Sequence, residues 1–237
     1  RKYMKILIRA SETDKTISGG ERFGDYRKSM ILKKCWISLM ANLDNSDSVM
    51  LFHNNVKNTT VNWLEDKCPT LIETVPAGNV NENFENAYYA LEKELKNETD
   101  ENALFAILDD DFLWTTNAIK VIKDFYYNWT GWKGFVTPND SVLEYIKHND
   151  TIVTVGPDRH WKVVSKVSFN LIGTKRIFTE NLDVIKKAML NISVEDLNKI
   201  KEKTNSLVPL PGVATHCAKH DMSPLVNWEY IWRGIEI

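Results

Sequence analysis

The chain has 237 residues, of which 43% are hydrophobic and 26% are charged. This is enough to build a full hydrophobic core, and it excludes disordered and collagen-like chains. Thirty Lys and Arg residues against 32 Asp and Glu residues give a net charge of −2, which leaves no cationic surplus for a phosphate polymer. General nucleic-acid binding is therefore not expected. The longest apolar runs fall far short of the roughly 20 residues that cross a bilayer, so no membrane span is expected.

Three scattered cysteines, Cys35, Cys68 and Cys217, are too few for a disulfide framework or a four-thiolate zinc site. They favour a reducing compartment. We expect a cytoplasmic protein, located in the host cytoplasm if the gene is viral. Asn-x-Ser/Thr triplets occur several times, but an Asn-rich chain produces them by chance, so they do not indicate secretion.

The first 140 residues alternate between strand-like and helix-like segments. Apolar strand-like runs lie at 5–9, 49–53, 70–75 and 103–108. Apolar residues at the helical spacing i, i+3, i+4 and i+7 recur over 32–43, 84–95 and 119–129. This alternation predicts an α/β fold with an open, mostly parallel sheet flanked by helices. In such sheets ligands bind beyond the carboxyl ends of the strands.

The rest of the chain has less helix between its strands. Strand-like runs lie at 134–137, 151–155 and 162–172. They predict that the sheet becomes mixed. Thr179 and Ser193 are the expected N-caps of helices over 180–190 and 194–203. The two prolines and the glycine of 205–212 predict an irregular loop.

No linker divides the chain, so we expect one domain over 1–237. Its first half, residues 1–115, carries the alternating segments and is expected to bind the ligand that sits at the strand ends. Its second half, residues 116–237, is expected to supply the acceptor side of the site and a C-terminal loop.

Asp109, Asp110 and Asp111 stand consecutively at the exit of the apolar strand over 103–108. Three carboxylates this close repel one another, and a bound divalent cation relieves the repulsion most readily. Side chains alternate along a strand, so Asp109 and Asp111 are expected to face the crevice and Asp110 the other side. The alternative is a turn that caps the next helix, but the position at a strand's carboxyl end favours metal binding.

This D-x-D motif, preceded by Gly78-Asn79 and a helix that contains Asn86-Ala87, resembles the nucleotide-sugar-binding half of GT-A glycosyltransferases. The resemblance implies that Asp111 binds a divalent metal that bridges the donor diphosphate. It also implies that Asp109 contacts the ribose or the sugar, with Asp110 in support. Residues 134–140, with Tyr145 after them, are similar to a segment of viral and phage-type members, so a viral or bacterial enzyme is expected.

The resemblance extends to the strand ends. Residues 6–11 are similar to the family's first strand and the loop that meets the nucleoside, and 52–55 end the second strand, where a base contact is common. The donor-binding residues implied in this way, besides Asp109 and Asp110, are Arg9, Ala10, Ser11, Asn54, Gly78 and Asn86.

Residues 212–216 resemble the late loop from which many GT-A enzymes supply a histidine to the metal, which implies His216 as a metal ligand. Mixed carboxylate and imidazole ligation suits Mn2+ and tolerates Mg2+. The alternative for His216 is a loop histidine bonded to backbone, and His220 is a second candidate ligand. A zinc site made of His216, Cys217 and His220 lacks a second thiolate and is disfavoured.

Transfer with inversion needs a base within hydrogen-bond reach of the acceptor hydroxyl. We expect Asp140 or Glu180 in this role, with Asp158 as a further candidate. Asp140 follows a strand end, and Glu180 is expected in the first turn after Thr179, where the family often places an acid that receives the acceptor. Each has a structural alternative, because Asp140 can cap a turn and Glu180 can complement a helix dipole. Transfer with retention requires no such base.

Aromatic residues gather in the part that would meet an acceptor, and an indole face is a platform for a sugar ring. They are Trp132, Trp161, Trp228, Tyr230 and Trp232. Most tryptophans are core residues, so only one or two are expected to line the site, with Trp161 and Trp228 favoured. The glycines of 18–20 lack the ending of a P-loop, and Arg22 or Arg27 beyond them is expected to reach a phosphate.

Together these features predict a metal-dependent glycosyltransferase that moves a sugar from a nucleotide-sugar, expected to be uridine-linked, to a glycan or other hydroxyl acceptor. The enzymatic alternative is a nucleotidyltransferase, which usually carries a Gly-rich, basic signature after its first strand, where this chain reads A-S-E-T-D-K. The alternative outside enzymes is a glycan- or protein-binding module on a degenerate transferase scaffold. The intact D-x-D motif and His216 count against it.

Overall fold

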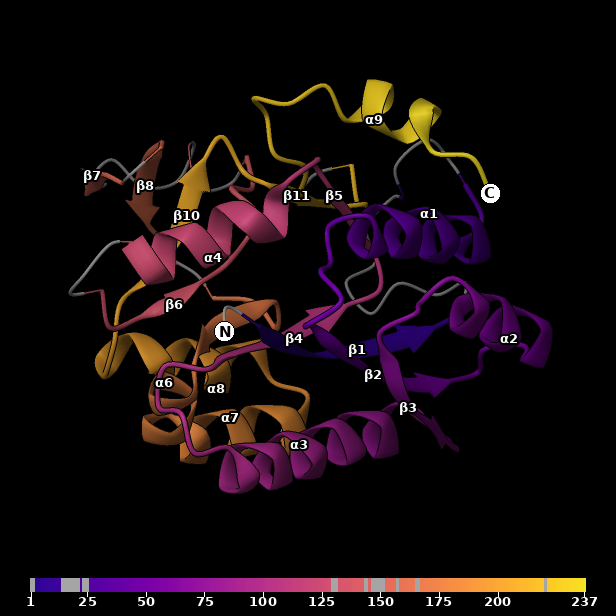
Figure 1. The fold of residues 1–237 in the computed structure, drawn as a ribbon, viewed down its shortest axis with the longest axis horizontal. Helices are drawn as coiled ribbons and strands as arrows, with labels where there is room; N and C mark the ends of the chain where they lie inside the picture. The colour runs from indigo at the N-terminus through magenta and orange to yellow at the C-terminus, as the bar shows by residue number, and fades with distance from the viewer. Residues whose placement is uncertain are drawn as a thin grey trace.

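The computed structural model of the chain describes residues 3–13, 22, 26–128, 132–142, 145, 152–156, 158–164, 167–219 and 221–237. The described residues form a nine-stranded, mostly parallel sheet that lies between two layers of helices (Figure 1). The expected α/β architecture is therefore confirmed. None of the described helices has both the length and the apolar composition that a bilayer crossing requires.

Four parallel strands make up one half of this sheet. They are β1 (Met4–Ser11), β2 (Ser48–Asn54), β3 (Leu71–Ala77) and β4 (Leu104–Asp109). They lie in the order β3-β2-β1-β4, so the chain moves outward from β1 to β3 and then returns to the other side of β1. This reversal creates a switch point between the carboxyl ends of β1 and β4, where open α/β sheets bind ligands.

The other half of the sheet is mixed, as the sequence predicts. β9 (Leu171–Thr174) pairs antiparallel with both β4 and β6 (Phe135–Val136). β10 (Ser206–Leu210) pairs parallel with β6 and antiparallel with β8 (His160–Val163), which pairs in turn with β7 (Val153–Val155). A separate two-stranded sheet joins β5 (Phe112–Trp114) to β11 (Ala214–His216).

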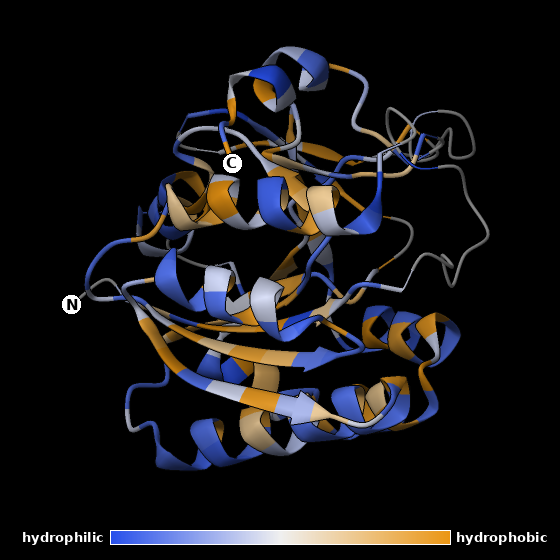
Figure 2. Cartoon of the chain, turned by 90° about the vertical axis from the view of Figure 1, so that its right-hand side faces the viewer, coloured by the Kyte–Doolittle hydropathy of each residue, from blue (hydrophilic) through white to orange (hydrophobic). Residues whose placement is uncertain are grey.

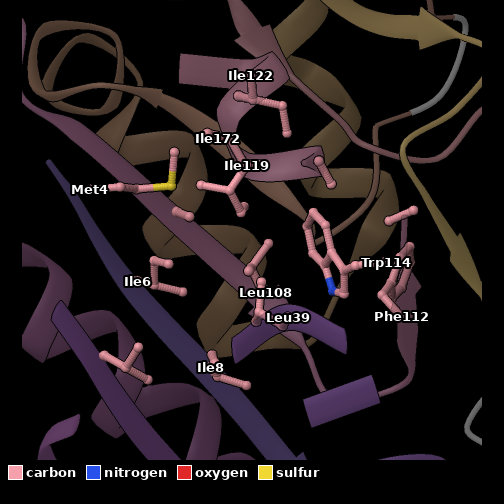
Figure 3. Packing of buried hydrophobic residues seen from close by; sticks show 14 of the residues in the cluster. Met4, Ile6, Ile8, Leu39, Leu108, Phe112, Trp114, Ile119, Ile122 and Ile172 are labelled. Carbon is pink, nitrogen blue, oxygen red and sulfur yellow. The ribbon is translucent and has the colours of Figure 1, made fainter. Parts of the chain in front are cut away.

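Side chains alternate between the two faces of the sheet, and along β1 and β4 nearly all of them are buried on both faces. Ile6 and Ile8 of β1 belong to the core beneath α1 (Lys28–Met40), α2 (Asn58–Asp66) and α4 (Ala118–Asn128) (Figure 3). Leu7 belongs to the opposite core. The helices of that second layer are α3 (Val80–Asn97), α6 (Lys175–Glu180), α7 (Leu182–Asn191) and α8 (Val194–Asn198). In Figure 2 hydrophobic residues are frequent along the strands, and hydrophilic and hydrophobic residues alternate along the helices that flank them.

Two further elements complete the described chain. A 3-10 helix, Lys199–Glu202, continues from α8, and α9 (Trp228–Gly234) lies near the C-terminus. The buried side chains of Trp228 and Trp232 pack with Ile31 and Cys35 of α1. The C-terminal segment is thereby fixed to the helix that begins beside the strand ends.

Two strand predictions in the second half are wrong. Residues 162–172 form two strands instead of one, because Val167 and Phe169 leave the ladder and pack into the core that contains α3. Residues 205–212 contain the regular strand β10, despite Pro209. β6 pairs only with Ser206 and Leu207, so the missing N–H of Pro209 costs no bond on that side.

One helix start is also wrong. Thr179 is not an N-cap: α6 begins after Thr174, whose hydroxyl accepts the Ile177 N–H at 3.4 Å, and α7 begins only at Leu182. Ser193 does cap α8, because its hydroxyl accepts the Asp196 N–H at 3.0 Å.

Candidate functional site

The parallel register brings the polar ends of three strands together. Arg9 of β1 lies beside Asp109 of β4, and Ser11 of β1 lies beside Asn54 of β2. All four residues line one cavity of about 460 Å3 at the switch point of the sheet. The expected position of the ligand site, beyond the carboxyl ends of the strands, is therefore where the structure has a cavity.

The cavity is lined by both polar and apolar residues. The polar ones are Arg9, Ser11, Thr13, Arg22, Lys28, Asn54, Asn83, Asp109, Asp110, Asp111, Ser168, Asn170, His216 and Asp221. The apolar ones are Ala10, Val80, Phe84, Phe112, Phe169, Ile192 and Val194. The Arg9 guanidinium contacts residues of both kinds, because it binds Asp109 and lies 3.6 Å from the centre of the Phe84 ring. The site thus offers ionic contacts next to a surface suited to a flat ring.

All three aspartates of the motif line the cavity, in contrast to the expected alternation. β4 ends at Asp109, and residues 110 and 111 form a turn, so the period of two does not continue through the motif. Asp110 accepts the Ser11 N–H at 2.9 Å, which ties the turn to the end of β1. The Asp109 N–H donates to Asn170 Oδ1 at 2.9 Å.

A lysine that the sequence did not single out lies between two of these carboxylates. Lys28 Nζ is 2.7 Å from Asp110 Oδ1 and 3.0 Å from Asp111 Oδ2, and its side chain is only 8% exposed. Burial lowers the pKa of Lys28, but the two carboxylates outweigh burial and raise it. Burial raises the pKa of Asp110 to about 6, whereas Lys28 and His216 overcome the burial of Asp111 and lower its pKa.

His216 reaches the aspartates through the small second sheet. β11 pairs antiparallel with β5 so that His216 lies opposite Phe112, and the Cys217 N–H donates to the Asp111 carbonyl oxygen at 2.8 Å. His216 Nε2 is then 3.5 Å from Asp111 Oδ2, while Nδ1 is 3.2 Å from Asp221 Oδ2. Burial lowers the pKa of His216, but Asp111 and Asp221 outweigh burial and raise it well above the usual value.

The pair formed by Asp111 and His216 fits a divalent cation. Adjacent ligands of an octahedral ion at about 2.1 Å lie roughly 3 Å apart, close to the observed separation of 3.5 Å. A carboxylate on the other ring nitrogen, here Asp221, is the usual partner of a metal-binding histidine. Across the described residues, no three His, Cys, Asp or Glu side chains gather as a complete metal site. The remaining ligands would have to be substrate oxygens and water, as is common for Mg2+.

The zinc alternative gains no support among the described residues. The Cys217 thiol is buried and lies 3.6 Å from the Cys35 thiol, in the core under α9. His220 lies outside the described residues, as do the glycines of 18–20.

Most of the expected donor-binding residues line the cavity. These are Arg9, Ala10, Ser11, Asn54, Asp109 and Asp110, together with the expected metal ligands Asp111 and His216. Arg22 also lines it, whereas Arg27 is exposed and does not.

Gly78 and Asn86 do not line the cavity; the residues of α3 that do are Val80, Asn83 and Phe84. The Asn83 amide donates to the Ala10 carbonyl at 3.2 Å and to Asn54 Oδ1 at 2.7 Å, so it links the ends of β1 and β2. Asn79 caps α3 by accepting the Glu82 N–H. The sequence N-x-x-E at 79–82 carries this signal, and it would have placed Asn83 in the turn nearest the strand ends.

The three candidate bases also lie outside the cavity lining. Asp140 is fully buried and accepts a hydrogen bond from the Tyr145 hydroxyl at 2.7 Å, and burial raises its pKa. Glu180 is exposed at the C-terminal end of α6, not in a first turn. Asp158 is exposed and pairs with Arg159. The cavity lining therefore includes none of the three expected bases.

The two favoured tryptophans are core residues. Trp161 is fully buried, with its ring centre 4.0 Å from that of Phe125, and Trp228 is buried against α1. Tyr230 is 78% exposed and does not line the cavity. The aromatic residues that do line it are Phe84, Phe112 and Phe169.

Comparison with known proteins leaves the family open. No protein-family model and no curated protein sequence matches the chain. Galactosyltransferase LgtC, solved with donor and acceptor sugar analogues, matches at 8% identity with a TM-score of 0.45, over 86% of this chain and 72% of that chain. HddC from Yersinia pseudotuberculosis matches at 10% identity with a TM-score of 0.41, over 77% and 79%.

A third solved structure covers nearly the whole chain. It is 4-diphosphocytidyl-2C-methyl-D-erythritol synthase, which matches at 11% identity with a TM-score of 0.46, over 98% of this chain and 97% of that chain. With TM-scores below 0.5, these three superpositions are too loose to assign the chain to any of the three families. The function has to be inferred from the site.

Proposed function

We propose that this chain is a metal-dependent glycosyltransferase of the GT-A type. It transfers a sugar from a nucleotide-sugar, with uridine as the expected nucleoside, to a glycan or other hydroxyl acceptor. The observation that carries the proposal is the pair formed by Asp111 and His216, whose side chains come from distant segments and lie 3.5 Å apart in a cavity at the switch point.

Different residues of the cavity would hold different parts of such a donor. Phe84 and Phe169, which lie against each other in the cavity lining, would offer a flat ring a stacking surface, and the amide pair of Asn54 and Asn83 would offer it hydrogen bonds. Asp111 and His216 would hold Mn2+ or Mg2+ against the diphosphate. Asp109, whose side chain is 32% exposed and paired with Arg9, would accept hydrogen bonds from a sugar or ribose hydroxyl.

The chemistry requires compensation of negative charge. The bound cation would stabilise the charge that develops on the leaving nucleoside diphosphate. Asp221 holds the imidazole of His216 in one orientation, with Nε2 toward Asp111, and Arg22 adds positive charge to the cavity wall. Phe112 stacks on the His216 ring with 5.2 Å between ring centres, which further limits its rotation.

One observation favours a nucleotidyltransferase as the second candidate. Such enzymes usually carry a basic signature after the first strand, which the sequence immediately after β1 lacks. In the structure, however, Arg22 and Lys28, both from the segment between β1 and the first turn of α1, line the cavity. Two cations there suit a triphosphate as well as a diphosphate.

Ligand binding and product analysis separate the two candidates. Thermal-shift titrations with uridine-, guanosine- and cytidine-linked sugars and with the matching triphosphates, with and without Mn2+, report which ligand stabilises the fold. The glycosyltransferase proposal predicts stabilisation by a nucleotide-sugar only with metal, and release of nucleoside diphosphate on turnover. Stabilisation by a triphosphate, with pyrophosphate released in the presence of a sugar phosphate, would support the nucleotidyltransferase instead.

A pair of variants ties the result to the site. Asp111→Asn is expected to abolish metal-dependent stabilisation by the donor, because it removes the charge of the expected metal ligand while keeping the shape. Asp66→Asn, a 71% exposed carboxylate of α2 outside the cavity, is the matched control and should behave as wild type. Metal-dependent donor binding that survives in Asp111→Asn would refute the assigned site. Binding of a glycan without any nucleotide would support the binding-module alternative.

A further inference from the structure

The Lys28 ammonium is the counter-ion of two of the three motif aspartates, Asp110 and Asp111. It is the hydrogen-bond donor to both Asp110 and Asp111, and it is nearly inaccessible to solvent. Arg9 plays the corresponding part for Asp109. Each carboxylate of the motif therefore already has a basic side chain of the protein against it, and the repulsion that the sequence suggests is relieved without any ion.

The same oxygen of Asp111 serves both Lys28 and the expected metal site. Asp111 Oδ2 accepts from Lys28 Nζ at 3.0 Å and faces His216 Nε2 at 3.5 Å. A divalent cation held by this oxygen and this nitrogen would share Asp111 Oδ2 with the ammonium, so the two positive charges would lie close together. Their repulsion in a buried site is strong, since a low local dielectric weakens screening.

A lysine ammonium changes its position by rotation about the bonds of its own side chain. Lys28 is the first residue of α1, and a lysine ammonium is carried on a flexible four-carbon stem. The cavity that it lines is the space into which the ammonium would move. There it needs a new anionic partner, because an unpaired buried charge is costly.

We propose that the Lys28 ammonium competes with the divalent cation for Asp111, so that the metal enters the site together with the donor and not before it. The donor diphosphate supplies the new partner of the displaced ammonium. The inference rests on the proposed function, since it assigns an order of binding to that site. Because the coupling is reciprocal, the metal must tighten the nucleotide by the same factor by which the nucleotide tightens the metal.

Mn2+ binding in the absence of any nucleotide tests the competition directly. Free Mn2+ is measured by electron paramagnetic resonance during titration with wild type, Lys28→Met, Lys28→Gln and Lys33→Met. Lys33 belongs to the same helix, but its ammonium lies 4.9 Å from the centre of the Trp63 ring, away from the acids. We expect Mn2+ to bind both Lys28 variants about tenfold or more tightly than wild type and Lys33→Met, because removing a like charge strengthens cation binding.

A second measurement keeps the test decisive if the Lys28 variants are poorly folded. In wild type, Mn2+ affinity should rise about tenfold or more when UDP is added, within the usual range of coupling between two ligands. In any Lys28 variant that folds, Mn2+ alone should raise the melting temperature more than it does in wild type. Equal Mn2+ affinity in wild type and Lys28 variants without nucleotide would overturn the competition. So would tight Mn2+ binding by wild type that UDP does not change.

Failure of this inference is distinguishable from failure of the proposed function. If nucleotide-sugars bind to wild type with metal but the Lys28 variants gain no Mn2+ affinity, the competition is refuted and the transferase proposal stands. If the Lys28 variants gain Mn2+ affinity but no nucleotide-sugar binds to any form, the competition is supported and the proposed donor is refuted.

Discussion

Replacement of Lys123 by methionine should destabilise the fold strongly, because this lysine is a buried cation in an ion pair. Lys123 is on α4, its side chain is 4% exposed, and its ammonium lies 2.7 Å from a carboxylate oxygen of Asp47, which is fully buried. Asp47 in turn accepts the Met4 N–H at 2.8 Å, at the start of β1. The pair thus connects the helix layer to Met4, the first residue of β1.

The expected loss is about 3 kcal/mol. Breaking a buried ion pair by removal of one partner costs about 3–5 kcal/mol, because the other charge is left uncompensated. The lower end applies here, since Asp47 keeps the N–H groups of Met4 and Asp44 as donors at 2.8 and 2.9 Å. In a chain of this size 1 kcal/mol shifts the melting temperature by about 2–4 °C, so a fall of about 6–12 °C is expected.

Urea unfolding measures this loss, with Lys120→Met as the matched control. Lys120 lies one turn earlier on α4 and pairs with Asp124, but its side chain is 71% exposed. Exposed pairs contribute little, so its replacement should change stability by at most about 0.5 kcal/mol. The urea midpoint of Lys123→Met should fall at an unchanged slope. Equal midpoints for the two variants would refute the role given to the buried pair.

Three further predictions address the site and its surroundings. Asp221→Asn should weaken Mn2+ binding in the presence of UDP about tenfold, because His216 loses the charged partner of its Nδ1. Gly212→Ala should destabilise the fold by about 1–3 kcal/mol, since a Cβ would lie 2.2 Å from Asp140 Oδ1. Glu98→Gln should make the free energy of unfolding less dependent on pH below about pH 4.3. Burial raises the pKa of Glu98, but the Tyr3 hydroxyl, the Asp100 N–H and Lys5 outweigh it and lower the pKa to about 2. The folded pKa lies below the unfolded value of about 4.3, so this stabilisation is present above that pH and is lost as the pH falls toward 2.

Each of these predictions has an outcome that would contradict it. Unchanged Mn2+ affinity in Asp221→Asn would show that Asp221 does not strengthen metal binding through His216. For Gly212, the comparison is Gly78→Ala, whose Cβ would lie 3.0 Å from the mobile end of the Glu82 side chain and should cost little; similar losses in both variants would contradict the close approach. For Glu98, stability curves of wild type and variant that run parallel from pH 5 to pH 2.5 would contradict the lowered pKa.

The first half of the fold was predictable because its periodicities are strong. The apolar segments over 5–9, 49–53 and 103–108 fall within β1, β2 and β4 or overlap them, and the helical stripes match α1, α3 and α4. The second half was harder to predict, because some of its buried apolar residues do not belong to strands. Val167 and Phe169 are as buried as strand residues although they lie outside the strands.

The residues that line the cavity were predictable where they lie at strand ends and not where they lie on helices. Asp109, Asp111 and Asn54 follow apolar strands, and parallel pairing brings such positions to one edge. Lys28 and Asn83 belong to the first turns of α1 and α3, and their positions depend on how each helix starts after its loop. No periodicity in the sequence gives that orientation.

His216 lies on β11, so the contact between His216 and Asp111 can form only late in chain synthesis. Asp111 leaves the ribosome roughly 100 residues before its partner, and that long loop closes only when β11 pairs with β5. Contacts so distant in sequence form slowly, and domains fold as the chain emerges from its N-terminus. A nascent chain therefore carries Asp111 for some time without His216. The side chains already made, Arg9 and Lys28, are the ones that keep the three carboxylates paired during that interval.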